Sequence, residues 1–470
     1  LMIRRPPRST LSSSSAASDV YKRQSGFLMT NTPLDRTEAA TGYWDSPWPV
    51  ECGGNRRQKA RSGRLDAAEA ETHVTLMRND RWNVMTVRRD EDEWYLGGTM
   101  PAFVGPPPYG WVARFDPESL ETLAESPQLP CGDHVWCGAI LAHADGTVMS
   151  VNGSYLHRLD PDDLSVLNER RLPVDRAHNG LLSLSDGTLV TKDLRLEGQG
   201  GTTLTFLDPT SLEVIETLLL PEGSMGRIAA DFHDGTDFIY VPGIEHIWKI
   251  DVVKGRPEIS DWRCRYRSID SDSGLAWDSC ISDGYLWLMD CGDIEGVRAI
   301  HHRLPNGRFD EPAGNLLSWQ RPAPWGSPQR LRRIHQNSAH LDSLEPFGNS
   351  GGGIIAPPVN VPEFKTAIAW DSINGGLAGI STAGDLSPIW HLNVKPSMQP
   401  VVFPESGELV INDFTTDQTD DLIVVDIETG ELLSRVKTGS RLANGMFLAA
   451  GDNRDIYYCS TLFWARVAWT

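Results

Sequence analysis

Basic residues are scarce in this chain relative to acidic ones. Its 470 residues include 43 Lys plus Arg against 63 Asp plus Glu, which gives a formal net charge of −20 at pH 7. Nucleic acids and anionic membrane surfaces select basic proteins, so neither is an expected partner. No apolar run approaches the ~18 residues that a membrane helix requires. Sixteen Trp, 10 Tyr and 13 Phe nevertheless provide too much aromatic surface for a disordered chain.

Cysteine is also sparse, and its spacing excludes two common uses. The seven cysteines are an odd number, and no Cys-x-x-Cys pair occurs, so neither a disulfide framework nor a thiol redox motif is expected. Cys131, His134 and Cys137 have a spacing that hints at zinc. In an extended strand, however, His134 would point away from both cysteines, and a fourth ligand is missing. We therefore expect buried, reduced thiols.

Common catalytic motifs are missing as well. The sequence contains neither Gly-x-Ser-x-Gly nor His-Glu-x-x-His, so serine-hydrolase and zincin chemistry have no support. The glycine run at 351–353 is not followed by Gly-Lys-Ser/Thr, which excludes a phosphate-binding loop of that type.

The first 24 residues differ from the rest of the chain in composition. They are rich in Ser and Arg and contain one acidic residue, which is typical of a transit peptide. The string also resembles the translated adapter sequence found at the ends of sequencing contigs, and on that interpretation residues 1–24 are not part of the natural protein. Met29 would then be the start, although a natural start further upstream stays open. The residues that follow Met29 lack the apolar core of a signal peptide, so we expect a cytoplasmic location.

Two short phrases recur along the chain. Asp-Gly stands between two apolar runs at glycines 146, 187, 235 and 284, which are 41, 48 and 49 residues apart. Such an Asp-Gly pair is a strong hairpin signal. The second phrase has an Asp-Pro turn between two further runs, and its copies begin at Arg114, Arg158 and Phe206. Looser copies of this phrase begin at Lys249 and Val424. Four short strands every ~40–50 residues is the size of one propeller blade.

The repeats predict an all-β chain with a single β-propeller of eight four-stranded blades, and seven blades is the alternative. The propeller spans 72–470 after an irregular segment over 25–71, and residues 72–77 supply the strand that closes the ring. A long loop without an obvious strand interrupts it at 321–350. The blades are expected near 81–130, 134–173, 178–221, 226–267, 274–321, 350–394, 399–439 and 442–470.

The segment VVDIETGELLSRV from Val424 resembles the repeat of the quinoprotein-alcohol-dehydrogenase-like and YVTN-type propellers. The resemblance covers about Asp80 to Thr470 and implies a fold rather than an activity. Members that use pyrroloquinoline quinone carry a repeated tryptophan-docking signature and, in many, adjacent cysteines. Neither is present in this sequence, so that cofactor is not expected.

Blade geometry predicts where polar residues gather. The loops before the first strand and after the second strand of each blade lie on one face, around the channel mouth. His178, Asn179, Asp193 and Asn444 form the central candidate site there, with Asp290 and Asp413 next. Asn179, Asp193 and Asn444 could hold a divalent cation such as Ca²⁺, an arrangement that resembles, in position only, propeller lactonases of the regucalcin and gluconolactonase kind.

The remaining roles follow from side-chain chemistry. Asp193, Asp290, Asp413 and His178 are candidate acid–base groups, and Lys192 and Arg227 could bind an anionic substrate group. Two structural interpretations stay open beside these. Asn-Gly pairs at 179–180 and 444–445 can be turn formers, and a carboxylate that ends a strand can cap a turn.

Two long loops are expected on the mouth face. The basic cluster Arg330, Arg332, Arg333 and His335 suggests a lid, and the loop over 99–109, with Phe103 and Tyr109, suggests a stacking wall. They favour a small-molecule binder or a metal-assisted enzyme (lactonase-like, hydrolase-like or degenerate quinoprotein-like) over a scaffold that binds a protein partner. The sequence does not decide between enzyme and binder.

Overall fold

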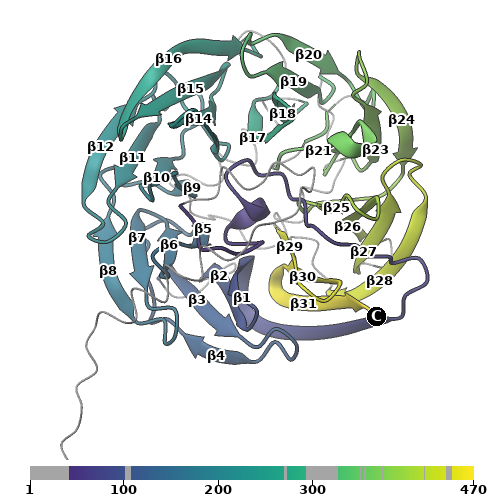
Figure 1. The fold of residues 1–470 in the computed structure, drawn as a ribbon, viewed down its shortest axis with the longest axis horizontal. Coiled ribbons are helices and arrows are strands. Elements are labelled where there is room, and N and C mark those ends of the chain that lie inside the picture. Colours follow the sequence, from purple (N-terminus) through teal and green to yellow (C-terminus); the bar gives the residue numbers. More distant parts are fainter. Residues whose placement is uncertain are drawn as a thin grey trace, which may run out of the picture. The chain divides into compact units, whose positions relative to one another are not determined.

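The computed structural model describes residues 42–100, 107–268, 273–292, 327–349, 351–353, 356–372, 374–415, 417, 419–440 and 447–470. Their strands form seven antiparallel sheets, six with four strands and one with seven. The sheets are arranged as a ring of blades (Figure 1). The described helices are the short 3₁₀ turns η1 (Glu51–Gly53) and η4 (Pro362–Phe364), and none could span a membrane.

Six blades are complete four-stranded sheets in which consecutive strands pair. Blade two consists of β5 (Cys137–Ala142), β6 (Val148–Asn152), β7 (Tyr155–Leu159) and β8 (Val166–Arg171). Blade three consists of β9 (His178–Ser183), β10 (Leu189–Asp193), β11 (Thr203–Leu207) and β12 (Val214–Leu219). Blade four consists of β13 (Ala229–His233), β14 (Thr236–Pro242), β15 (His246–Val253) and β16 (Arg256–Arg265). Blade five consists of β17 (Ala276–Ser282), β18 (Tyr285–Asp290), β19 (Leu331–His335) and β20 (Leu341–Leu344). Blade six consists of β21 (Val359–Val361), β22 (Thr366–Trp370), β23 (Leu377–Ser381) and β24 (Ser387–Leu392). Blade seven consists of β25 (Val401–Phe403), β26 (Glu408–Phe414), β27 (Asp420–Asp426) and β28 (Leu432–Ser440).

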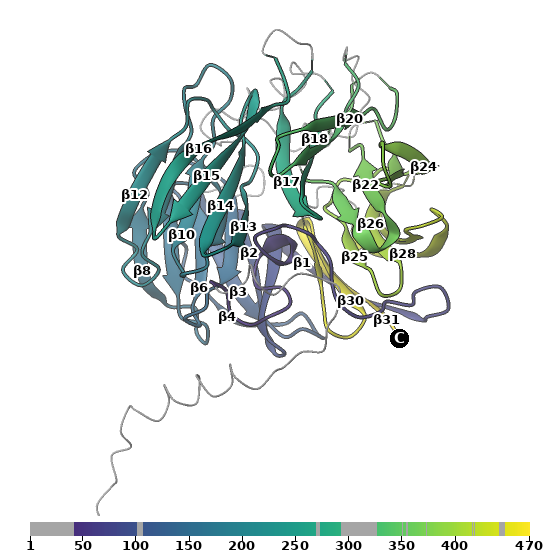
Figure 2. The ribbon, with the colours of Figure 1, turned by 45° about the horizontal axis from the view of Figure 1, so that its top comes forward.

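The seven-stranded sheet contains two blades that share strand β1. From Thr72 to Arg78, β1 pairs with β31, and from Trp82 to Asp90 it pairs with β2. Its first half is thus the outermost strand of blade eight, and its second half is the innermost strand of blade one. Figure 2 shows β1 beside β30 and β31. The predictions of eight blades and of ring closure by residues 72–77 are confirmed. The strands of this sheet are β29 (Leu448–Ala450), β30 (Asp455–Cys459), β31 (Thr461–Trp469), β1 (Thr72–Asp90), β2 (Glu93–Met100), β3 (Tyr109–Phe115) and β4 (Thr122–Glu125).

The repeated phrases form the turns on one face of the ring, which we call the turn face. All four Asp-Gly glycines, at 146, 187, 235 and 284, have positive φ, as a tight hairpin requires. In the Asp-Pro turn of blade one, Asp116 Oδ1 accepts the backbone N–H groups of Glu118 and Ser119. Leu120 then takes a left-handed conformation and is fully buried. Leu164 and Leu212 repeat this arrangement, so each turn fixes one apolar side chain in the core.

Blade five differs from its expected boundaries. Its third and fourth strands are β19 and β20, and β18 pairs with β19. The prediction that 321–350 holds no strand is therefore wrong for its described part. These two strands were missed because an insertion separates them from β18 in the sequence. In the structure Arg332 is buried and lies 2.6 Å from Asp290.

The segment before β1 lies at the centre of the ring (Figure 1). We call its residues 42–66 the axial strap. It forms isolated bridges to the innermost strands, from Val50 to Leu141 and from Ala60 to Val402. The backbone carbonyl of Asn55 also accepts the N–H of Ala230. This part of the irregular segment thus belongs to the propeller core, which the sequence did not indicate.

Candidate ligand site at the propeller axis

Blade three carries four of the candidate site residues at one end. Strand β9 begins with His178 and Asn179, and β10 ends with Lys192 and Asp193. Lys192 pairs with Asn179, and Asp193 pairs with His178. All four residues are buried. They lie on the face where innermost strands begin and second strands end, which we call the mouth face.

His178 has one ring nitrogen bonded and the other unbonded. Its Nδ1 lies 3.0 Å from the carbonyl oxygen of Arg176, which makes Nδ1 the donor. Nε2 is buried and has no hydrogen-bond partner among the described residues. Burial lowers the pKa of His178 to about 4, so the ring is neutral at pH 7. Its Nε2 lone pair is therefore available as a hydrogen-bond acceptor.

Asn179 links three neighbouring blades. Its Oδ1 accepts the indole N–H of Trp136 at 3.2 Å, and its Nδ2 donates to the carbonyl of Met225 at 3.1 Å. Gly180 follows with φ +76°, the left-handed conformation typical of an Asn-Gly turn. These contacts support the structural interpretation of Asn179. Asn444, its expected counterpart, lies outside the described residues.

The three candidate aspartates share a different arrangement. Each accepts a backbone N–H from a neighbouring segment with one oxygen and an arginine N–H with the other. Asp193 binds Thr203 N and Arg195, Asp290 binds Arg330 N and Arg332, and Asp413 binds Lys395 N and Arg435, all at 2.6–2.8 Å. Burial raises the pKa of Asp290 even though Arg332 lowers it. Both oxygens of each carboxylate are engaged, so these contacts favour loop anchoring and give a catalytic or metal-binding role no support.

Arg227 belongs to a buried group of alternating charges, which we call the axial charge ring. Arg57, from the strap, lies 2.5 Å from Glu51 and 3.0 Å from Asp278. Arg227 Nε lies 3.1 Å from Glu51 Oε2, and its Nη1 lies 3.7 Å from Asp278 Oδ2. Arg227 Nε and Nη2 are buried and make no hydrogen bond within the described part of the chain, and Glu51 Oε2 has none there either. Two guanidinium groups and two carboxylates thus balance in charge, but Arg227 keeps unused donors at Nε and Nη2.

Two buried lysines lie near this ring, and their contacts differ. Lys59 Nζ donates to three carbonyl groups, those of Arg57, Pro357 and Pro358, at 3.1–3.2 Å. Lys192 Nζ donates to the carbonyl of Ser224 at 3.2 Å, its single hydrogen bond among the described residues. Burial lowers the pKa of both lysines, that of Lys192 to about 7. The ammonium of Lys59 is saturated, whereas that of Lys192 is not.

Aromatic rings flank the Arg227 guanidinium. Its central carbon lies 4.8 Å from the ring centre of Phe447 and 5.8 Å from that of Trp136. Trp136 is half-buried and meets Trp82 edge-on at 6.2 Å. A cation held between aromatic rings, with an unused donor, is suited to a planar anion.

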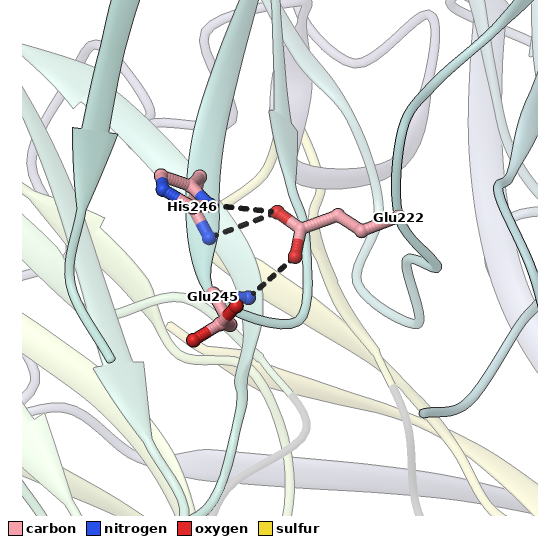
Figure 3. A group of neighbouring side chains, drawn as sticks. All are labelled: Glu222, Glu245 and His246. Carbon is pink, nitrogen blue, oxygen red and sulfur yellow. Dashed lines mark hydrogen bonds and ion pairs between the residues drawn. The ribbon is translucent and has the colours of Figure 1, made fainter. Parts of the chain in front are cut away.

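Glu222, Glu245 and His246 form a second polar group at the edge of blade four (Figure 3). Ligand atoms of all three lie within 4.8 Å of one another. Glu222 Oε1 accepts His246 N at 2.9 Å and Trp248 Nε1 at 2.6 Å, and its Oε2 accepts Glu245 N at 2.9 Å. Glu245 is also 2.9 Å from Arg265. The carboxylate of Glu222 therefore closes a turn, and these contacts explain the group without a metal.

The cysteine group considered for zinc is dispersed. Within the described residues, Cys131, His134 and Cys137 do not form a cluster of metal-ligating atoms. His134 Nε2 instead lies 3.3 Å from Asp175 Oδ1. Burial raises the pKa of Cys137 to about 12, as expected for an unreactive thiol.

Sequence reasoning missed the strap side of the site. Glu51 and Arg57 gave one usable signal, the basic run at 56–61 in an otherwise acidic chain. Asp278 belongs to no sequence motif.

The two loops expected on the mouth face have different outcomes. Phe103, expected in the stacking wall, lies outside the described residues. Arg330 and Arg333 of the basic cluster form ion pairs, Arg330 with Glu345 and Arg333 with Asp342.

No protein-family model matches the chain, and no curated protein matches its sequence. Solved structures do match. The quinohemoprotein alcohol dehydrogenase from Comamonas testosteroni is 10% identical with a TM-score of 0.57, over 97% of this chain and 84% of that one. A europium-containing methanol dehydrogenase is also 10% identical, with a TM-score of 0.58, over 91% of each chain. The likeness is one of fold, and it confirms the resemblance to quinoprotein-like propellers.

A protein solved in complex with a peptide segment of another protein matches as well. Sqt1 from Chaetomium thermophilum, solved with the N-terminus of ribosomal protein L10, is 11% identical with a TM-score of 0.52, over 92% of this chain and all of that one. The fold is therefore shared by enzymes and by binding proteins and does not choose between them.

Proposed function

We propose that the protein binds a small carboxylate at the mouth-face end of the propeller axis, with Arg227 and Lys192 as its cationic contacts. The observation that carries this proposal is Arg227 Nη2, a buried donor with no hydrogen bond from the described residues. A buried donor left unpaired costs about 1–3 kcal/mol, which a bound anion would recover.

The local charge balance supports the same ligand class. Near the axis, the four cationic side chains of Arg57, Arg227, Lys59 and Lys192 face two carboxylates, Glu51 and Asp278. Asp193 does not alter this balance, because Arg195 neutralises it. The surplus is positive whenever a lysine is protonated, so an anion would be stabilised there. The rings of Trp136 and Phe447 would contact the apolar part of the ligand.

Calorimetric titration with acetate, lactate and benzoate tests the proposal. We expect binding to the wild-type protein and at least a tenfold loss in Arg227→Gln and in Lys192→Met. Arg435→Gln is the matched control, since Arg435 pairs with Asp413 on the same face but in blade seven. Absence of binding to the wild type, or equal losses in all three variants, would refute the site.

A protein-binding role is the second candidate, and one observation favours it. Large apolar side chains are exposed on outermost strands, among them Leu123 of β4 and Leu219 of β12. Such residues are common at interfaces when they form one continuous patch. Here they are spread over several blades, so the axial site has the stronger support. If Leu219→Ser still binds carboxylates, the exposed apolar residue is not part of the axial site, and carboxylate binding and protein binding can be tested separately.

A further inference from the structure

We propose that Lys192 is a carbonyl-reactive amine that forms an imine with small 2-oxo acids. The proposal rests on the proposed function for one contact, the carboxylate of the 2-oxo acid at Arg227. It adds a covalent step and names a narrower ligand class.

The comparison with Lys59 carries the geometric argument. Both lysines are buried, and neither forms an ion pair with a described carboxylate. An ammonium has three donors. Lys59 uses all three on carbonyl groups, whereas Lys192 uses one, on Ser224. These contacts stabilise the protonated form more at Lys59 than at Lys192, which favours the neutral, nucleophilic amine at Lys192.

The charged groups around Lys192 come from three blades. Burial is the largest influence and lowers its pKa, and Arg227 of blade four lowers it further. Asp193 on its own strand and Asp278 of blade five raise it. His178 on β9 is neutral and leaves this balance unchanged at pH 7. The resulting pKa of about 7 leaves a large neutral fraction at physiological pH.

The covalent step balances without any further reactant. The Nζ lone pair attacks the carbonyl carbon, and the C=O π pair moves to oxygen, which takes a proton to give a carbinolamine. Loss of that hydroxyl as water, with the second amine proton, leaves a C=N bond. The products are one imine and one water molecule, and no oxidant or reductant is consumed.

Burial also sets the size of the partner. Lys192 has no exposed surface, and Ser224 and Arg227 adjoin it from blade four. In a 2-oxo acid the carbonyl carbon is bonded directly to the carboxylate carbon, so a small 2-oxo acid suits a site in which the anion binds Arg227. We therefore expect glyoxylate and pyruvate to react and a bulky aldehyde such as pyridoxal phosphate to be excluded.

Reductive trapping tests the inference on the full chain. The protein is incubated with pyruvate and sodium cyanoborohydride, and the modified peptides are mapped by mass spectrometry. We expect one dominant adduct, at Lys192, that is lost in Lys192→Met. Lys437, an exposed lysine, is the internal control and should stay largely unmodified. The initial trapping rate should rise with pH around an apparent pKa near 7.

The possible outcomes separate this inference from the proposed function. Lactate has the size of pyruvate but no reactive carbonyl, so its binding tests the anion site alone. Lactate binding without a Lys192 adduct overturns the imine and leaves the carboxylate site standing. A Lys192 adduct that forms equally fast in Arg227→Gln supports the reactive amine and refutes the anion contact. Equal labelling of Lys192 and Lys437 overturns the inference.

Discussion

Asp420 is expected to make the protein less stable as the pH rises from about 4 to about 7. The side chain is fully buried at the start of β27 and accepts the hydroxyl of Tyr458 at 2.6 Å and the amide of Asn412 at 2.9 Å. Burial is the largest influence and raises its pKa from 3.8 to about 7, against these two hydrogen bonds. Between the two values the folded state holds a proton that the unfolded state has released, so unfolding becomes easier with rising pH.

The size of this effect follows from the shift. A difference of about 3 pKa units corresponds to at most ~4 kcal/mol in the free energy of unfolding, all of it lost by pH ~7 and constant above that. Asp420→Asn removes the titrating group, and its amide can still bond both Asn412 and the Tyr458 oxygen. The variant should be about as stable as wild type near pH 4, where both side chains are neutral in the folded state, and more stable than wild type at pH 8.

Urea unfolding followed by tryptophan fluorescence at half-unit pH steps measures this difference. The wild-type-minus-variant curve matters, because His178 contributes a slope of the opposite sign: its lowered pKa, about 4, makes stability rise between pH 4 and 6.5. Subtraction cancels that contribution. A difference curve that is flat from pH 4 to 7 would refute the burial argument for Asp420.

Two further predictions concern stability. Arg57→Met should lower the free energy of unfolding by about 3–5 kcal/mol, because it removes one of the two guanidinium groups that pair with the buried carboxylates of Glu51 and Asp278. Arg64→Met, at an exposed pair with Asp66, should change the stability little. Thermal melts of both variants compare them. Gly153→Ala should be far more destabilising than Gly255→Ala, although both glycines have positive φ, because a Cβ at 153 would lie 2.0 Å from the Cys131 carbonyl oxygen and one at 255 meets nothing within 4 Å. Similar denaturation midpoints for the two alanine variants would contradict the steric argument.

The parts of the fold that follow from local chemistry were predictable. A hairpin depends on its own few residues, so Asp-Gly at 146 and its repeats located the blades, and the Asp-Pro turns located their outer strands. The strap was not predictable, because Val50 and Ala60 form single bridges to distant strands and leave no periodic pattern. The outer strands of blade five were missed because an insertion separates β18 from β19 in the sequence.

In the candidate site, too, some features were predictable from the sequence and others were not. Strand order alone predicted that His178 and Asp193 emerge together, and they are paired in register. Sequence could not show that Asp193 is occupied by Arg195, because Arg195 lies beyond the end of β10, where the alternation of a strand no longer tells which way a side chain points. Nor could it bring Glu51 to Arg227, which are 176 positions apart and meet only through the ring.

The sharing of β1 between two blades also fixes the order in which the protein can be completed during synthesis. Blades two to seven are each made from continuous or nearly continuous chain, so each can pair its strands soon after it is translated. The first half of β1 has to wait for β31, nearly 400 residues later. Such non-local pairing is slow to form. Until then Thr72 to Arg78 presents an unpaired strand edge, which makes the nascent chain most prone to aggregation at this seam.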